Sequence, residues 1–197
     1  SSCENDLGVT EDQKADYFLR TLQIVNELDY VDYMMQYETH MGGNKYYLET
    51  NWGALGSPTD RVNQYAANQV FIGYGAFNNL LAGYKYAGSE QLSQSVFVRK
   101  YTNAATKKNM WILWTDDTEA NVTITLNRAS ARLFDFYGNA IGIAYNSDRV
   151  SFNETFDGSI KYLQTDSSDF IKSIVAVKNG TSDDTKEEKP DNTVINN

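Results

Sequence analysis

Residues 95–165 contain short runs in which apolar and polar side chains alternate, separated by Gly, Asn, Asp and Ser. This period of two is typical of strands that bury one face. Gly138-Asn139, between two of the runs, predicts a hairpin turn. The spacing of the runs indicates an antiparallel β-sandwich, with strands predicted at 95–101, 109–115, 120–126, 131–137, 140–145, 149–153, 160–164 and 170–177.

Two tryptophans constrain how this sandwich packs. Trp111 and Trp114 lie on one predicted strand, and because their separation is odd their side chains point to opposite faces. At most one of them points straight into the sandwich core. The other is free to meet the part of the chain that precedes the strands.

The residues before the strands follow a helical period. Thr10-Glu11-Asp12-Gln13 is a capping box, so a helix is predicted from Glu11 to about Leu28. An apolar strand at 31–37 follows after a short connection, as in α/β units. A second helix is predicted at 62–81, with Gly83 as its C-cap.

The chain therefore divides into three parts. Residues 1–88 form an α/β unit, 89–178 the β-sandwich and 179–197 a polar, charged tail or linker. Within the first part, residues 38–60 are too rich in glycine for a regular helix and form a long loop at the end of a strand. Loops in that position often line binding sites.

Composition excludes several classes of function. The net charge of −9 argues against nucleic acid and anionic membranes as partners, because both require a basic face. No apolar run approaches the ~20 residues that cross a bilayer, so no membrane insertion is predicted. The chain begins without Met at Ser1, so we expect its N-terminus to be processed or truncated.

Few residues favour a cofactor or a metal. Cys3 is the single cysteine and His40 the single histidine, which leaves neither an internal disulfide nor a Cys-based zinc site. Cys3 is either a free thiol or one half of a bridge to a residue outside this chain. Gly73-Tyr74-Gly75 lies within a helical pattern and indicates close packing rather than a phosphate loop. We predict no cofactor and no metal site.

Three N-glycosylation sequons begin at Asn121, Asn153 and Asn179. Asn121 has the most favourable setting, because Val122, Ile124 and Leu126 point to one side of their strand and leave Asn121 on the outward side. The sequons predict a secreted or extracellular protein.

The order of these segments resembles the final part of a clan A glycoside hydrolase, namely the last helix–strand–helix of a (β/α)8 barrel followed by a small C-terminal β-domain. The resemblance spans roughly residues 8–164. It is carried by residues 8–17, by 33–38 as the eighth barrel strand, by Asn51-Trp52-Gly53-Ala54-Leu55, and in the β-domain by Val96-Phe97-Val98-Arg99, Trp111-Ile112-Leu113-Trp114 and Asp135-Phe136-Tyr137-Gly138-Asn139.

The resemblance implies an α/β segment followed by an all-β domain. It also implies a fragment of a secreted retaining glycosidase that hydrolyses O-glycosidic bonds in an oligo- or polysaccharide. Both catalytic carboxylates of that clan would precede Ser1, so no catalytic residue is assigned here, and the remainder of the barrel is an expected partner. The alternative is a non-catalytic extracellular β-sandwich module that binds a glycan or serves a structural role.

Four residues of 37–52 are predicted to line a substrate pocket. A nucleophile role for Glu38 requires a helix over 39–51, which Gly42-Gly43-Asn44 disfavours, so Glu38 is assigned to the pocket or to orienting a catalytic group. His40 either bonds a sugar hydroxyl or lies on the surface without a role. Trp52 either stacks on a pyranose or fills the core, and Tyr37 lies nearest the barrel mouth.

Overall fold

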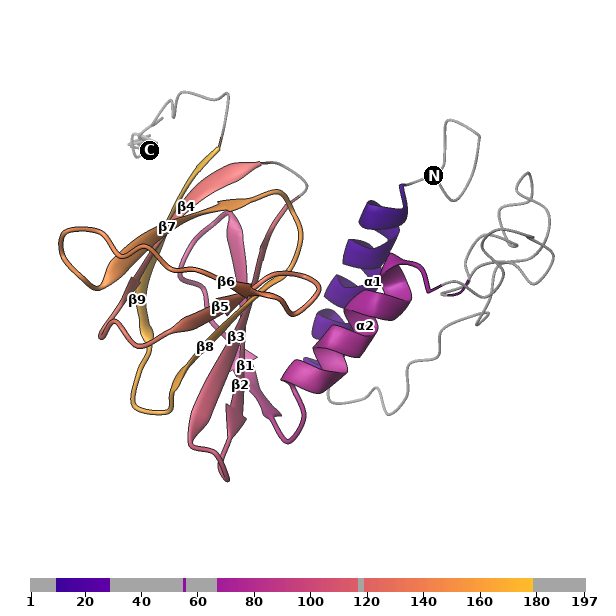
Figure 1. Cartoon of the computed structure of the whole chain (residues 1–197), viewed down its shortest axis with the longest axis horizontal. Coiled ribbons are helices and arrows are strands. Elements are labelled where there is room, and N and C mark those ends of the chain that lie inside the picture. The colour runs from indigo at the N-terminus through magenta and orange to yellow at the C-terminus, as the bar shows by residue number, and fades with distance from the viewer. Residues whose placement is uncertain (1–9, 29–54, 56–66, 117–118, 179–197) are drawn as a thin grey trace, which may run out of the picture.

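Two antiparallel sheets and two helices make up the described part of the chain, which in this computed structural model comprises residues 10–28, 55, 67–116 and 119–178 (Figure 1). The elements in chain order are α1 Glu11–Val25, α2 Gln69–Leu80, β1 Lys85–Ser89, β2 Val96–Asn103, β3 Lys108–Thr115, β4 Ala120–Leu126, β5 Arg132–Phe134, β6 Ala140–Ile141, β7 Ser151–Phe156, β8 Lys161–Asp166 and β9 Ile171–Lys178. One sheet has six strands in the order β1-β2-β3-β8-β5-β6, and the other has three in the order β7-β4-β9.

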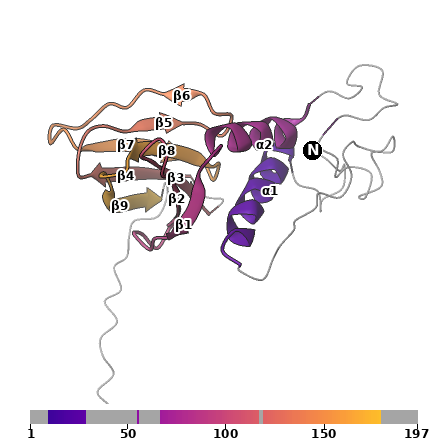
Figure 2. The same cartoon turned by 90° about the horizontal axis from the view of Figure 1, so that it is seen from below.

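The elements form three layers, with the six-stranded sheet between the helices and the three-stranded sheet (Figures 1 and 2). One buried cluster joins the two sheets and includes Val98, Ile124 and Phe156. A second cluster joins the six-stranded sheet to the helices and includes Leu19 and Phe77. The sandwich predicted from the sequence is confirmed, and the helices cover its outer side.

Strand β3 is buried on both faces, because it lies in the middle layer. Trp111 packs between the two sheets, whereas Trp114 packs on the side of the helices. Both indoles are almost fully buried, at 0% and 4% exposed. The prediction that the two tryptophans point to opposite layers is therefore confirmed.

The helix ends follow local sequence signals. Thr10 caps α1 through the predicted capping box, in which its hydroxyl accepts from the Gln13 amide and the Gln13 side chain accepts from the Thr10 amide. Asn68 caps α2 by accepting from the Phe71 amide. The C-cap of α2 is Leu81 rather than the predicted Gly83. Gly83 follows two residues later with φ of +77°, a conformation that favours glycine.

Several helices and strands have bounds that differ from the predicted ones. Helix α1 ends at Val25 rather than near Leu28, and α2 begins at Gln69, with 56–66 outside the described residues. Strand β4 has the predicted bounds, whereas β5 and β6 are shorter than predicted. Strand β1 was missed, because its alternation between half-buried and exposed positions contains only one large apolar side chain, Tyr86.

Most of the segment predicted to form the end of a barrel lies outside the described residues. The predicted strand 31–37 and most of the loop 38–60 lie beyond the described residues. Of that loop, Leu55 is described, and it forms an antiparallel bridge with Ala67 immediately before α2. The described residues establish a helix-covered antiparallel sandwich.

Gly73 allows α2 to approach the sheet layer closely. A Cβ at this position would lie 2.3 Å from two ring atoms of Phe136. At Gly75, by contrast, an added Cβ would meet no other heavy atom of the described residues within 4 Å, apart from its chain neighbours and the adjacent backbone of α2 itself. The close packing predicted for this glycine pair therefore applies to Gly73.

We predict that Gly73→Ala destabilises the chain by about 1–3 kcal/mol, because the new methyl group forces the Phe136 ring or α2 to shift. Gly75→Ala is the matched control, and it should stabilise the chain by up to about 1 kcal/mol through helix propensity. Urea unfolding of both variants measures the difference. Equal effects of the two substitutions would contradict the close approach of α2 to Phe136.

Candidate functional site

Helix α1 and the turn after it carry a polar stripe on the flank of the apolar face that packs on the sheet. Its members are Asp16, Arg20, Gln23 and Glu27, whose separations of four, three and four residues place them on one side of a helix. Each of the four makes a hydrogen bond or an ion pair to the β-sheet half of the chain or to the loops that join its strands. We call these residues the α1 polar stripe.

The first half of the stripe meets the turn between β7 and β8. The Ser159 hydroxyl donates to the Asp16 carboxylate at 3.2 Å, and the Arg20 guanidinium donates to the Gly158 carbonyl. Beside these contacts lies a hollow of about 40 Å³, which residues from both helices and two turns of the sandwich line: Asp12, Ala15, Asp16, Gln69, Phe136, Tyr137 and Ser159.

Asp16 is a buried carboxyl group with an altered affinity for protons. Its side chain is 8% exposed, and its Oδ1 atom has no hydrogen-bond partner among the described residues. Burial raises the pKa of Asp16 from 3.8 to about 6, although the nearby Arg20 and the Ser159 hydrogen bond lower it in part. The charges of Asp157 and Asp12 add to the increase.

The second half of the stripe meets β1 and β2. The Tyr101 hydroxyl donates to Gln23 Oε1 at 2.8 Å and accepts from Asn26 Nδ2 at 2.8 Å. Burial raises the pKa of Tyr101 to about 12, so this phenol stays protonated and can donate at neutral pH. These bonds connect the end of α1 to the middle of β2.

Glu27 forms the last connection of the stripe. Its Oε1 atom accepts from the Tyr86 hydroxyl at 3.0 Å and from the Ser89 hydroxyl, and Arg99 pairs with it. Three partners on two adjacent strands thus share one carboxylate oxygen. Charge-assisted bonds of this kind are stronger than neutral ones, so Glu27 fixes the end of α1 against the edge of the sheet.

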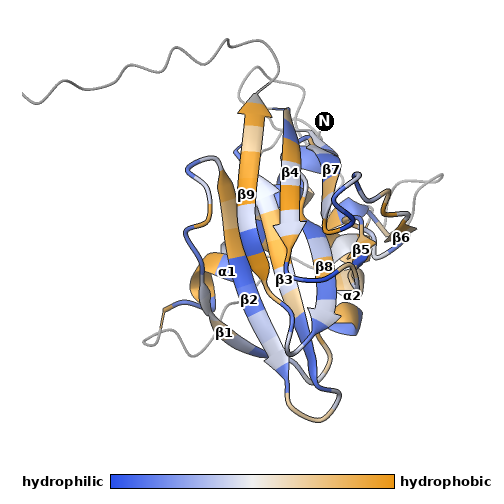
Figure 3. Ribbon diagram, turned by 90° about the vertical axis from the view of Figure 1, so that its left-hand side faces the viewer, coloured by the Kyte–Doolittle hydropathy of each residue, from blue (hydrophilic) through white to orange (hydrophobic). Residues whose placement is uncertain are grey.

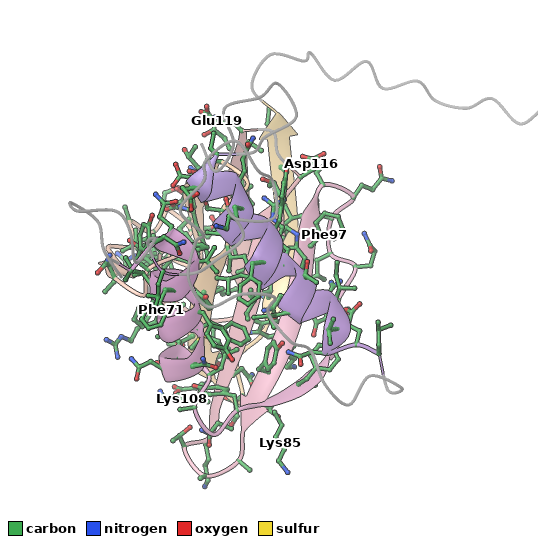
Figure 4. The ribbon with its side chains drawn as sticks, turned by 90° about the vertical axis from the view of Figure 1, so that its right-hand side faces the viewer. Phe71, Lys85, Phe97, Lys108, Asp116 and Glu119 are labelled. Carbon is green, nitrogen blue, oxygen red and sulfur yellow. The ribbon has the colours of Figure 1, made fainter. Side chains whose placement is uncertain are left out.

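An aromatic pair lies on the sheet next to this end of α1. Phe97 stacks on Trp114 with ring centroids 5.3 Å apart and planes inclined by 14°, and the Arg99 guanidinium lies 5.1 Å from the Trp114 ring. Phe97 is 45% exposed, so its ring meets solvent on β2 beside α1 (Figure 4). An exposed aromatic face of this kind can stack on the C–H face of a sugar ring.

The hollow and the stripe limit the chemistry that this region can perform. A volume near 40 Å³ holds a water molecule or two, whereas sites for small molecules usually measure about 300–1,000 Å³. Asp16 can exchange a proton near pH 6, but a sugar ring does not fit beside it. The stripe therefore acts chiefly to hold α1 on the sheet.

The substrate-pocket residues predicted from sequence, Tyr37, Glu38, His40 and Trp52, lie outside the described residues, as does Asn179. Their assignments stay predictions. Asn121 on β4 and Asn153 on β7 are described, and both are exposed. The structure thus places two of the glycosylation candidates on neighbouring strands, β4 and β7.

Sequence reasoning missed Asp16 and the other members of the stripe. The available signal was their helical spacing next to Ala15 and Leu19, which place the apolar face of α1. That spacing alone also fits a solvated helix face. The burial of Asp16 depends on Ser159 and Phe136, which are far away along the chain.

Comparison with known proteins adds no family assignment. No protein-family model matches the chain, and no curated protein matches it significantly. Among the described residues, no group of three or more His, Cys, Asp or Glu side chains could hold a metal ion. In the same part of the chain, neither helix combines the length and apolar character needed to span a bilayer.

The raised pKa of Asp16 predicts a pH dependence. The folded chain holds this proton up to about pH 6, whereas the unfolded chain releases it near 3.8, so the folded state binds more protons in between. Stability from this group is complete below pH 3.8 and is lost as pH rises to about 6. Asp16→Asn cannot lose a proton, so its stability relative to the wild type should rise across that window, by roughly 2 kcal/mol.

Urea unfolding of both proteins at pH 4 and pH 7 measures this change, and every other titratable group is shared. Ser159→Ala is a useful companion, because it removes a hydrogen bond that lowers the pKa of Asp16 and should move the midpoint to higher pH. A difference in stability that is the same at both pH values would contradict the burial of a titrating Asp16.

Proposed function

We propose that this chain forms the C-terminal part of a secreted retaining glycoside hydrolase. In this proposal α1 and α2 are helices of a (β/α)8 barrel, and the sandwich is the β-domain that follows it. The substrate is an oligo- or polysaccharide, and the bond hydrolysed is an O-glycosidic bond. The resemblance in segment order supports the proposal, and one feature of the helix pair carries it.

That feature is an apolar surface on the side of the helices away from the sheet. Val70 and Phe77 of α2 face the sheet and are buried, yet Phe71, Ile72 and Tyr74 on its other sides are 43–49% exposed. A helix that is apolar all round is normally buried all round. Figure 4 shows Phe71 on this outward side of α2.

Helix α1 contributes to the same surface. Its Phe18 ring meets the Tyr74 ring edge-to-face at 5.8 Å, and Tyr17 and Ile24 are 38% and 48% exposed. Exposed apolar patches of this kind usually mark an interface. The strands of a barrel are a suitable cover, because barrel helices bury one face on the strands that they surround.

In this proposal, chemistry requires two carboxylates about 5 Å apart, one as nucleophile and one as general acid and base. Both would come from barrel strands that precede this chain. The residues Tyr37, Glu38, His40 and Trp52 would line the rim of the pocket at the barrel mouth. The sandwich would hold the last two helices in place through the α1 polar stripe.

The decisive experiment is to determine the coding sequence upstream of the Ser1 codon and to produce the longer protein. We expect further strand–helix units and a Glu at the end of the strand that precedes residue 1. This protein should hydrolyse a glycoside with retention at the anomeric carbon, as followed by NMR. Replacing that Glu by Gln should lower the rate at least about 10²-fold.

A start codon or a signal sequence directly before the Ser1 codon would exclude this mechanism. The binding-module alternative would then apply, since Phe97 on Trp114 offers an exposed aromatic face. In that case the chain itself should bind a polysaccharide, and Phe97→Ala should remove the binding. The same variant should leave hydrolysis by the longer protein largely unchanged.

The outward face of α2 provides a separate test. In the chain alone Phe71→Ser should change stability little, because the ring is half exposed. In the longer protein it should destabilise by about 3 kcal/mol, since truncating a buried Phe loses that much. Phe170→Ser is the control, because Phe170 is 47% exposed and precedes β9 in another layer. Equal effects of Phe71→Ser in both proteins would contradict burial against a barrel.

A further inference from the structure

Two of the sequons face each other across neighbouring strands of the three-stranded sheet. Asn121-Val122-Thr123 lies on β4 and Asn153-Glu154-Thr155 on β7, and the strands are antiparallel. The register pairs Asn121 with Thr155 and Thr123 with Asn153. Each asparagine is therefore opposite the threonine of the other sequon, on the outward face of the sheet.

Hydrogen bonds follow this register. Thr155 donates from Oγ1 to Asn121 Oδ1 at 3.1 Å, and Thr123 donates from Oγ1 to Asn153 Oδ1 at 2.8 Å. Both bonds use the carbonyl oxygen of the asparagine, whereas an N-linked sugar is attached to Nδ2. A glycan on either residue can therefore keep its cross-strand bond.

The two asparagines differ in their neighbours on the sheet. Asn153 donates from Nδ2 to Asn146 Oδ1 at 3.4 Å, and Asn146, which precedes β7, donates from its own Nδ2 to the hydroxyl of Ser151, the first residue of β7. Asn121 lies on the central strand of this sheet, and its neighbour on the other side is Val177 of β9. A sugar on Asn121 would thus extend toward β9.

The outward face of β9 is unusually apolar for an exposed strand. Val175 and Val177 are 57% and 60% exposed, and the register places them opposite Thr123 and Asn121. Figure 3 shows β9, β4 and β7 side by side on this face, with β9 largely coloured as hydrophobic. Side chains directly opposite in a sheet have Cβ atoms about 5 Å apart, which is within reach of a sugar ring linked to Asn121.

We propose that Asn121 carries an N-linked glycan whose first N-acetylglucosamine lies over Val175 and Val177. The apolar face and the N-acetyl methyl group of this sugar would cover the two valines. An uncovered apolar edge strand promotes association with other strands, so the glycan also shields β9. The proposal depends on passage through the secretory pathway, which the proposed function includes, but not on glycosidase activity.

The modification is a group transfer from a lipid-linked pyrophosphate oligosaccharide. A bond forms between Asn121 Nδ2 and C1 of the N-acetylglucosamine, and the bond between C1 and the pyrophosphate oxygen breaks. The amide loses one proton, and the lipid pyrophosphate leaves with the electron pair of the broken bond. The product keeps one N–H and the Oδ1 acceptor that Thr155 uses.

The test is to secrete the 197-residue chain from eukaryotic cells behind an added signal sequence and to map its glycopeptides by mass spectrometry. We expect Asn121 to be occupied in the unchanged chain. Asn121→Gln should lose that glycan, and Asn153→Gln, the matched control on the paired strand, should retain it. This experiment is independent of the glycosidase proposal, because it measures no hydrolysis.

Contact with β9 is tested by trimming the glycan enzymatically to its first N-acetylglucosamine. We expect NMR cross-relaxation between the sugar protons and the methyl groups of Val175 and Val177. Asn121→Gln should increase binding of a hydrophobic dye, and adding Val175→Thr and Val177→Thr should reverse the increase. An unmodified Asn121, or an occupied Asn121 without contact to either valine, would overturn the proposal.

Discussion

The burial of β3 on both faces is the constraint on which the rest of the structure depends. A strand with Trp111 on one side and Trp114 on the other requires a layer against each of them. The three-stranded sheet covers the first, and the helices cover the second. Neither layer alone could bury both indoles, so β3 requires both the three-stranded sheet and the helices as cover.

The same requirement explains why polar groups are buried in α1. Helix α1 packs its apolar face on the sheet, and the polar side chains on its flank also need hydrogen-bond partners. The α1 polar stripe finds these partners in the turn between β7 and β8 at one end and on β1 and β2 at the other. Asp16 is the buried carboxyl group of the stripe, and its Oδ1 has no hydrogen-bond partner among the described residues. Burial of this carboxyl group, only partly offset by Arg20 and by the Ser159 hydrogen bond, raises its pKa to about 6.

Local signals in the sequence were sufficient for many elements. The capping box placed the start of α1, and strict alternation gave β4 its bounds and assigned the two tryptophans to opposite layers. Features that depend on distant residues were not predictable. Strand β1 has a bulge between Tyr86 and Gly88, and the pairing of two sequons requires β7 to lie beside β4 rather than another strand. The pocket candidates at 37–52 stay predictions.

The layered arrangement makes the two proposals compatible. The apolar surface of α1 and α2 lies on one side of the six-stranded sheet, and the outward face of β4, β7 and β9 lies on the other (Figure 1). A barrel packed on the helices would therefore leave Asn121 open to solvent. Conversely, a glycan on Asn121 would project away from the barrel and its substrate. Under the two proposals, each face of the stack would have one distinct kind of cover, protein over the helices and carbohydrate over β9.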